Sequence, residues 1–284
     1  MEELKPVSQM ISSQAGASQR FEHQPETRVQ TKKRLEAEAA RFNKAVVEPT
    51  DGIYCNLCGN KLTIARVIEA NNDWYVEDIL CSCNAQRNAL RKRKASGMEE
   101  AINTVGSFEA NEEWQKIILT KAREFVGQSA ARCFYIGGQS GSGKTHISTL
   151  ICRTLIDRGM PLLYRKWSET IKSLNDYRNE ERDQLMKELK EIKVLYLDDF
   201  FKPAGSNATF SSAEIRTTFG IIDSRYISRD KITIFSSELT SNELFGVDTA
   251  IARRITEMTG NRFMIDVQKD MSHMYRRVDY AHKQ

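Results

Sequence analysis

Short apolar runs alternate with longer amphipathic stretches from about Phe108 to the end of the chain. Runs of this length predict strands that are buried on both faces, and the longer stretches predict helices. Regular alternation of the two predicts an α/β fold, a parallel sheet with helices on both faces. The predicted strands are Cys133–Ile136, Leu162–Tyr164, Val194–Leu197, Ile232–Phe235 and Phe263–Val267, and the predicted helices include Thr145–Arg158, Ser168–Tyr177, Ala213–Ser228 and Thr249–Met258.

The N-terminal part of the chain has a different pattern. Residues 1–49 are rich in Ser, Gln, Glu, Lys and Arg, but Leu35, Ala39, Phe42 and Val46 recur at helical spacing. This spacing predicts a helix within Thr27–Val47 that either docks on a partner protein or packs on its own domain. From residue 51 to about residue 86, turn residues at Gly59 and Asn60 and short strand-like runs such as Leu62–Ile68 and Trp74–Ile79 predict a small module of two ribbons.

Composition and charge restrict the class of protein. The 284 residues suggest roughly two domains, and 40% hydrophobic residues, 28% charged residues and 5 prolines indicate a globular chain. The net charge of +4 is too small to indicate a nucleic-acid partner. No apolar run approaches the roughly 18 residues of a membrane span, and the first thirty residues lack the apolar core of a secretory signal, so we expect a cytoplasmic protein without a membrane partner. Basic residues do cluster locally in Asn84–Lys94, which predicts an exposed basic helix or linker: Arg87, Arg91, Lys92, Arg93 and Lys94.

One glycine-rich segment fits the phosphate-binding pattern G-x-x-x-x-G-K-[ST] in full: Gly138-Gln139-Ser140-Gly141-Ser142-Gly143-Lys144-Thr145. A predicted strand precedes it and a predicted helix follows it, as a P-loop requires. Backbone N–H groups would converge on the phosphates of ATP at the helix N-terminus, Lys144 would neutralise the β- and γ-phosphates, and Thr145 would bind Mg²⁺. His146 follows Thr145 directly, and we expect it to contact the nucleotide as well. The alternative is a Gly/Ser-rich turn before an ordinary helix.

Two carboxylates follow the buried run Val194–Leu197. Four apolar residues that end in Asp198 and Asp199 would be a costly core strand unless a cation meets the carboxylates. We expect Asp198 on the Mg²⁺ side and Asp199 as the general base that polarises the attacking water. The alternative is a strand that ends in a solvated acidic turn.

Polar residues also follow a third predicted strand, which ends in Ser236, Ser237 and Glu238. Glu238 is at the place of a sensor of the γ-phosphate. The predicted helix Thr249–Met258 carries Arg253 and Arg254, and an arginine that reaches a neighbouring subunit's nucleotide would stabilise the charge that develops on the phosphoryl group. The alternative is that both arginines are ordinary surface charges.

Four of the six cysteines have metal-ligand spacing. Cys55 and Cys58 form a C-x-x-C-G pair, and Cys81 and Cys83 form a C-x-C pair after 22 intervening residues. Four thiolates predict a closed, structural Zn²⁺ site; the alternatives are free buried thiols or a redox pair. We expect Cys133 and Cys152 to be buried thiols.

Taken in order, these motifs resemble those of the DnaC/DnaI-type replicative helicase loaders, particularly phage-encoded relatives with an N-terminal zinc ribbon. The resemblance covers roughly residues 50–270. The segments that carry it are the two cysteine pairs, Ser96-Gly97-Met98, Gly106–Ala110, the helix with Trp114 and Gln115, Gly138–Thr145, Leu197–Phe200, Asp223–Tyr226, Phe235–Glu238 and Ala250–Ile255.

The resemblance implies an AAA+ core, with the helical lid absent or reduced, that binds ATP and single-stranded DNA and self-associates through its ATP sites. It also implies an N-terminal region that contacts a DnaB-type helicase and loads it onto single-stranded DNA. Arg254 aligns best with the family's trans-acting arginine, while Glu238 stands where the family usually has Asn. Transposition helper ATPases of the IstB type share nearly all the ATPase motifs and remain an alternative, with duplex DNA and a transposase as partners.

The resemblance and the motifs together predict four segments. They are a polar and helical segment at 1–49, a zinc-ribbon-like module at 50–86, a basic helix or linker at 87–107 and an AAA+ ATPase domain at 108–284.

Overall fold

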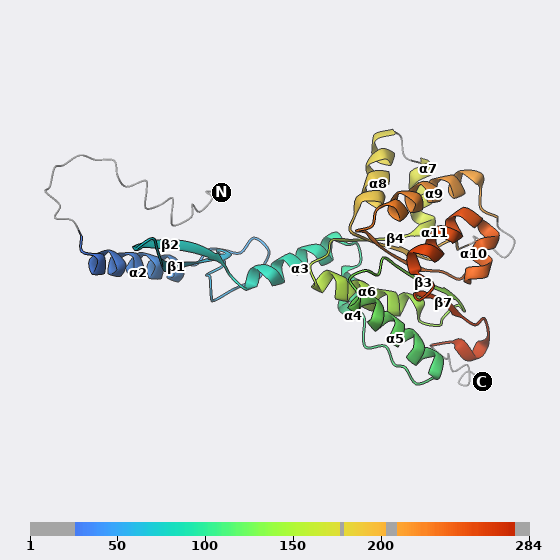
Figure 1. The fold of residues 1–284 in the computed structure, drawn as a ribbon, viewed down its shortest axis with the longest axis horizontal. Coiled ribbons are helices and arrows are strands. Elements are labelled where there is room, and N and C mark those ends of the chain that lie inside the picture. Colours follow the sequence, from blue (N-terminus) through green and yellow to red (C-terminus); the bar gives the residue numbers. More distant parts are fainter. Residues whose placement is uncertain (1–25, 177–178, 203–208, 276–284) are drawn as a thin grey trace, which may run out of the picture. The chain divides into compact units, whose positions relative to one another are not determined.

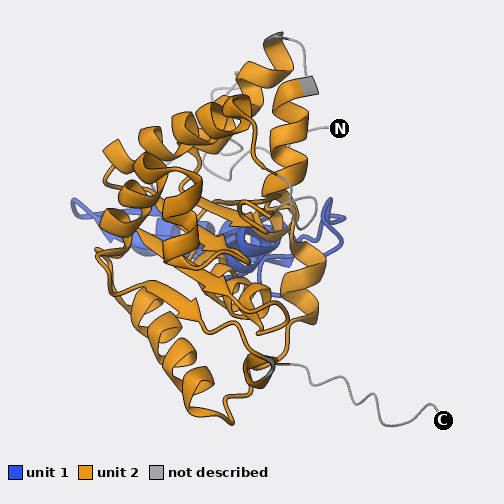
Figure 2. Cartoon of the chain, turned by 90° about the vertical axis from the view of Figure 1, so that its right-hand side faces the viewer, with its two compact units in different colours: residues 1–90 blue, residues 91–284 orange. Residues whose placement is uncertain are grey.

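The chain divides into two compact units, residues 1–90 and residues 91–284 (Figures 1 and 2). The structure is a computed structural model, and it describes residues 26–176, 179–202 and 209–275. Most of the predicted polar tail therefore lies outside the described residues. The four predicted segment boundaries stay predictions.

The first unit pairs a helix with a β-hairpin. Helix α2 (Arg28–Lys44) begins at a capping box in which Thr27 and Gln30 satisfy each other's backbone N–H groups. Strands β1 (Thr63–Ala70) and β2 (Asp73–Leu80) are antiparallel and are joined by two asparagines with positive φ, as a tight hairpin turn requires. The amide of Asn43 in α2 exchanges two hydrogen bonds of 2.9 Å with the backbone of Ala65 in β1. The predicted helix thus packs on its own unit, whereas docking on a partner stays a prediction.

The helix α3 (Cys83–Ala95) corrects one prediction. The sequence predicted that the basic residues of this stretch would be exposed, but Arg87 is only 3% exposed. Its guanidinium forms an ion pair with Asp51 and donates to the carbonyl of Ile53. A buried guanidinium needs such partners, and they lie more than thirty positions earlier in the chain, where no local pattern reveals them. Lys94, by contrast, is exposed.

The second unit contains a parallel five-stranded sheet, with strand order β4-β5-β6-β3-β7. Its strands are β3 (Cys133–Gly138), β4 (Leu162–Lys166), β5 (Val194–Asp198), β6 (Ile232–Ser236) and β7 (Met264–Val267). All five coincide with predicted strands to within a few residues.

Helices cover both faces of this sheet (Figure 1). Alternate strand residues point to opposite faces, so Phe134 and Ile136 belong to one core and Cys133 and Tyr135 to the other. The α/β class is therefore confirmed. One face carries α4 (Glu99–Thr104), α5 (Glu113–Gly127) and α6 (Lys144–Asp157), and the other carries α7 (Trp167–Asp176), α8 (Asn179–Glu191), α9 (Ser212–Ile227), α10 (Ser241–Val247) and α11 (Thr249–Thr259).

A buried arginine joins the outer elements of this second face. Arg225 of α9 is 1% exposed, and its guanidinium donates to the Thr233 hydroxyl at 2.8 Å. It also donates to the carbonyls of Leu189 at 3.0 Å, Ile192 at 2.9 Å and Ile232 at 2.6 Å. Burial lowers the pKa of Arg225 to about 10. Arg225 therefore cross-links α9, the connection from α8 to β5, and β6.

The strand order brings the carboxyl ends of β3, β5 and β6 together, where ligands bind in open parallel sheets. Ile136 pairs with Ser236, and Leu197 pairs with Phe235. The P-loop segment and both polar strand ends therefore lie at one edge of the sheet. After β7 the chain continues, as far as residue 275, with only the 3-10 helix η1 (Met271–His273), so this described part contains no helical lid. Within the described ranges, no helix has the length and apolar character needed to span a membrane.

Candidate nucleotide-binding site

The segment between β3 and α6 has the backbone of a phosphate-binding loop. Gly138, Gly141 and Gly143 have φ of +107°, +75° and +86°, values that favour glycine. A Cβ on Gly138 would lie 1.9 Å from the carbonyl oxygen of Val267, so no side chain fits there. The loop ends at the N-terminus of the 14-residue helix α6, where backbone N–H groups favour an anion.

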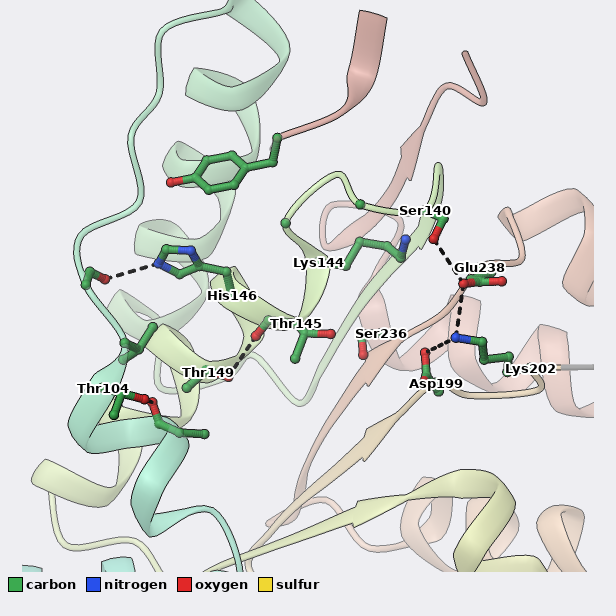
Figure 3. Close-up of a pocket in the computed structure, with 16 residues that line it drawn as sticks. Thr104, Ser140, Lys144, Thr145, His146, Thr149, Asp199, Lys202, Ser236 and Glu238 are labelled. Atoms are coloured by element: carbon green, nitrogen blue, oxygen red, sulfur yellow. Dashed lines mark hydrogen bonds and ion pairs between the residues drawn. The ribbon is translucent and has the colours of Figure 1, made fainter. Parts of the chain in front are cut away.

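A cavity of about 510 Å³ opens beside this loop (Figure 3), within the size range of small-molecule sites. Eight residues of the predicted site line it, namely Ser140, Gly141, Gly143, Lys144, Thr145, His146, Asp199 and Glu238; Gly138, Gln139, Ser142 and Asp198 are not among its lining residues. The remaining lining residues are Ala101, Thr104, Val105, Gly106, Thr149, Lys202, Ser236 and Tyr275.

Lys144 is held inside the loop. Its side chain is largely buried, and its ammonium donates to the carbonyls of Gly138 at 3.1 Å and Gln139 at 2.6 Å. Burial lowers the pKa of Lys144 to about 8, although the carboxylates of Glu238 and Asp199 oppose this shift. Both of these acceptors are neutral, so an anionic ligand would stabilise the ammonium in this partly desolvated loop.

Thr145 and Asp198 form the pair expected at a magnesium site. The Thr145 hydroxyl donates to Oδ1 of Asp198 at 3.1 Å, and the carboxylate is 5% exposed. Oδ1 also accepts from Tyr196 at 2.9 Å and from Ser236, and Oδ2 accepts from Tyr164 at 3.3 Å. Four hydroxyl donors orient this carboxylate, and a hydroxyl and a carboxylate oxygen side by side are the hard ligands that Mg²⁺ prefers.

Asp199 and Glu238 face each other across the mouth of the cavity, with a lysine between them (Figure 3). Lys202 lies 3.4 Å from Asp199 Oδ1 and 3.2 Å from Glu238 Oε1. The Ser140 hydroxyl of the loop donates to Glu238 at 3.2 Å. The predicted general base and the predicted sensor are thus connected through one ammonium group.

Aromatic rings cover the loop from the other side. Phe108 stacks on Tyr275 with ring centroids 4.7 Å apart, and His146 meets both rings edge-on at 5.5 Å. The ring of His146 also hydrogen-bonds the Gly106 carbonyl at 3.1 Å, and the Tyr275 N–H donates to the Gly141 carbonyl at 2.9 Å. The segment after β7 is therefore fastened to the phosphate-binding loop.

The two arginines do not line this cavity. Arg254 donates to Asp223 at 2.7 Å, and its guanidinium lies 4.5 Å from the Phe219 ring centroid. Arg253 is exposed on the same helix. Both arginines border a separate hollow of about 360 Å³.

The four predicted zinc ligands converge in the first unit. The sulfur atoms of Cys55, Cys58, Cys81 and Cys83 all lie within 4.8 Å of one another, with Cys55 to Cys81 at 3.7 Å and Cys58 to Cys83 at 3.6 Å. Tetrahedral zinc with Zn–S bonds of about 2.3 Å would place sulfurs about 3.8 Å apart. Hydrogen bonds from backbone amides, chiefly that of Cys58, lower the pKa of Cys55 to about 6, whereas burial raises that of Cys83 to about 12. The cluster is compatible with zinc, and the other two cysteines, Cys133 and Cys152, are fully buried as predicted.

Several residues of the site were not predicted from sequence. Tyr196 lies two positions before Asp198 on β5, so the strand's period of two places both on one face, and this signal was available. Tyr164 and Tyr275 carry no local signal, because each reaches the site through contacts distant in sequence. Lys202 follows Asp199 by three positions, but the positive φ of Asp199 that places it over the cavity has no signal in the residue type.

Comparisons with known proteins support the predicted resemblance. No protein-family model matches the chain. It is 29% identical over 198 residues to the phage-like element PBSX protein XkdC of Bacillus subtilis, covering 66% of this chain and 73% of XkdC. It is 28% identical over 125 residues to the replicative helicase loader DnaC of Escherichia coli K12, covering 38% of this chain and 51% of DnaC, so the match spans about half of that protein.

Among solved structures, a crystal structure of DnaI aligns with a TM-score of 0.45 and 19% sequence identity, covering 65% of this chain and 97% of that chain. The sequence matches confirm the resemblance of this chain to phage-like, DnaC-type helicase loaders, and the structure has the expected five-stranded parallel sheet with its glycine-rich loop.

Proposed function

We propose that this chain is an ATPase of DNA replication that loads a hexameric DnaB-type helicase onto single-stranded DNA. The observation that carries the proposal is the cavity at the glycine-rich loop, where Lys144, Thr145 and Asp198 are arranged as a phosphate and magnesium site. This cavity lies in a chain that is similar in sequence to the replicative helicase loader DnaC.

ATP fits the residues that are present. The free N–H groups at the start of α6 would bind the phosphates, and Lys144 would exchange two neutral carbonyls for charged oxygens. Mg²⁺, held by Thr145 and Asp198, would neutralise charge on the phosphates. Tyr196 and Ser236 would keep the Asp198 carboxylate oriented during turnover.

Hydrolysis would use the residues at the cavity mouth. Asp199 is the candidate base for the attacking water, and Glu238 the candidate sensor of the terminal phosphate. Arg253 and Arg254 lie outside the cavity, as expected of residues that act on a neighbouring protomer's nucleotide. The ATP sites would therefore be completed by self-association.

The zinc-binding cluster would have a structural role. Four thiolates leave no open position on a tetrahedral zinc ion, and three of these cysteines are buried. We propose that the ion holds the first unit folded, and that this unit contacts the helicase.

Loading onto circular single-stranded DNA tests the proposal. The chain would be mixed with a hexameric DnaB-type helicase and the covalently closed circle, with ATP, with ADP or without nucleotide, and helicase retained on the DNA would be measured. Retention should require ATP and be lost in Lys144→Ala, with Lys187→Ala, an exposed lysine on α8, as the matched control. Absence of helicase binding together with ATP-dependent binding of duplex DNA would refute the proposal and favour a transposition helper of the IstB type.

A further inference from the structure

The turn that follows β5 is unusual for residues with side chains. Asp199 and Phe201 both have φ of +50°, a conformation that L-residues adopt only at a cost. The turn is held by the core: Phe200 and Phe201 are fully buried, and the Phe200 N–H donates to the Ser236 carbonyl at 2.8 Å. Trp167 packs on Phe201 with ring centroids 4.7 Å apart. Lys202 therefore emerges over the cavity from a fixed backbone.

Electrostatics give Lys202 a defined role at this position. Although burial opposes it, the contacts with Glu238 and Asp199 raise the pKa of Lys202. Among the residues that the structure describes, the charged groups that line the cavity are Lys144, Lys202, Asp199 and Glu238, two of each sign. Without Lys202, two carboxylates would face the incoming phosphates with one cation. Like charges at short range repel, so Lys202 favours a phosphate that extends to the mouth, beside these two carboxylates.

Lys202 and Lys144, the two cations of the cavity, have different hydrogen-bond partners. Lys144 is bonded to the carbonyls of Gly138 and Gln139 inside the loop. Within the described part of the chain, Lys202 forms ion pairs with two carboxylates at the mouth, and its side chain remains 43% exposed. A half-exposed ion pair contributes little to stability, so Lys202 can exchange partners at low cost.

We propose that Lys202 is the specificity-determining residue that distinguishes a nucleoside triphosphate from a diphosphate. In the nucleotide-free cavity its ammonium neutralises Asp199 and Glu238. The terminal phosphate of a bound triphosphate takes over the ammonium, and Asp199 is released to face the attacking water. A diphosphate lacks the phosphate that reaches the mouth and leaves the two ion pairs in place. This inference rests on the proposed ATP site at Lys144.

Equilibrium binding of two nucleotides tests the inference. Calorimetry with magnesium would compare ADP with the non-hydrolysable triphosphate AMPPCP for the wild type, Lys202→Met and Lys202→Arg. Because a hydrogen bond to a charged group is stronger than a neutral one, Lys202→Met should bind AMPPCP on the order of tenfold more weakly, with ADP affinity unchanged within about twofold. Lys202→Arg should retain most of the discrimination.

The matched control is Lys193→Met, which removes a lysine paired with Asp230 at 3.7 Å, just before β5 at the opposite edge of the sheet. It should leave both affinities unchanged. Glu238→Gln should tighten AMPPCP binding relative to ADP, since it removes a competitor for Lys202.

Two outcomes would overturn the inference while leaving the ATP site intact: equal weakening of both nucleotides in Lys202→Met, or no change in either. If the wild type bound neither nucleotide, the proposed function would fail and the inference with it. Lys202→Arg also distinguishes loss of the charge from a folding defect. If Lys202→Met binds neither nucleotide and Lys202→Arg does not restore binding, a role of the Lys202 charge in phosphate recognition is contradicted.

Discussion

Replacement of Arg225 by methionine should strongly destabilise the second unit. Methionine has a similar length and is apolar, so it fills much of the space without any donor. The change would leave the carbonyls of Leu189, Ile192 and Ile232 and the hydroxyl of Thr233 without their partner. Since Arg225 is fully buried, water cannot simply replace it.

The expected loss follows from these partners. A buried acceptor that loses its donor costs about 1 to 3 kcal/mol. Three carbonyls that lose their donor would together cost more than about 3 kcal/mol. Relaxation of the loop that ends α8 should recover part of this cost, so we expect the free energy of unfolding to fall by about 3 to 5 kcal/mol. Arg225→Lys keeps the charge, but one ammonium cannot reach the acceptors near α8 and those on β6 together. We therefore expect a loss of stability of about 2 to 3 kcal/mol.

Urea unfolding followed by tryptophan fluorescence would measure this loss. Trp167 is buried in the second unit and reports on its unfolding. Arg229→Met, an exposed arginine just beyond the end of α9, is the control and should stay within about 0.5 kcal/mol of the wild type. A loss below 1 kcal/mol for Arg225→Met would show that the four hydrogen bonds do not hold these elements together.

Three further predictions concern the sites. Lys144→Ala should abolish ATP binding, while Asp199→Asn should keep binding and slow turnover, as measured by calorimetry and phosphate release; unchanged turnover in both would contradict the site assignment. Native mass spectrometry should find one zinc ion per chain, absent from a Cys55→Ser, Cys58→Ser variant, and a folded metal-free protein would contradict the zinc site. Because the pKa of Lys144 is about 8 in the free protein and bound phosphates would favour its charged form, ADP binding should take up a proton above pH 8, and affinity should fall with rising pH by up to tenfold per unit. A flat affinity between pH 8 and 9.5 would refute this linkage.

The sheet was predictable because its strands are buried on both faces. Each strand is a short apolar run, and a run such as Val194–Leu197 is typical of a strand that is buried on both faces of a parallel sheet. The glycine-rich loop was predictable because its glycines are required by backbone geometry, as at Gly138. Such requirements are local and therefore visible in sequence.

The environment of Arg87 and the position of Lys202 were not predictable in this way. Arg87 looks like its exposed neighbours in α3, and only the chain's return to Asp51 buries it. Lys202 is one lysine among many, and its place over the cavity depends on a positive φ at Asp199, which nothing in the residue type suggests. Long-range contacts and strained turns cannot be predicted from local sequence patterns, because the residues that stabilise them lie elsewhere in the chain.

The packing of Trp167 on the turn that carries Lys202 gives the protein an intrinsic optical probe. The indole lies against Phe201, and its N–H donates to the Thr218 hydroxyl at 3.1 Å. A small shift of that turn would alter the surroundings of the indole and hence its emission. Stopped-flow mixing with nucleotide would therefore show whether this turn moves or stays fixed when nucleotide binds, without any attached dye, once Trp74 and Trp114 are replaced by phenylalanine.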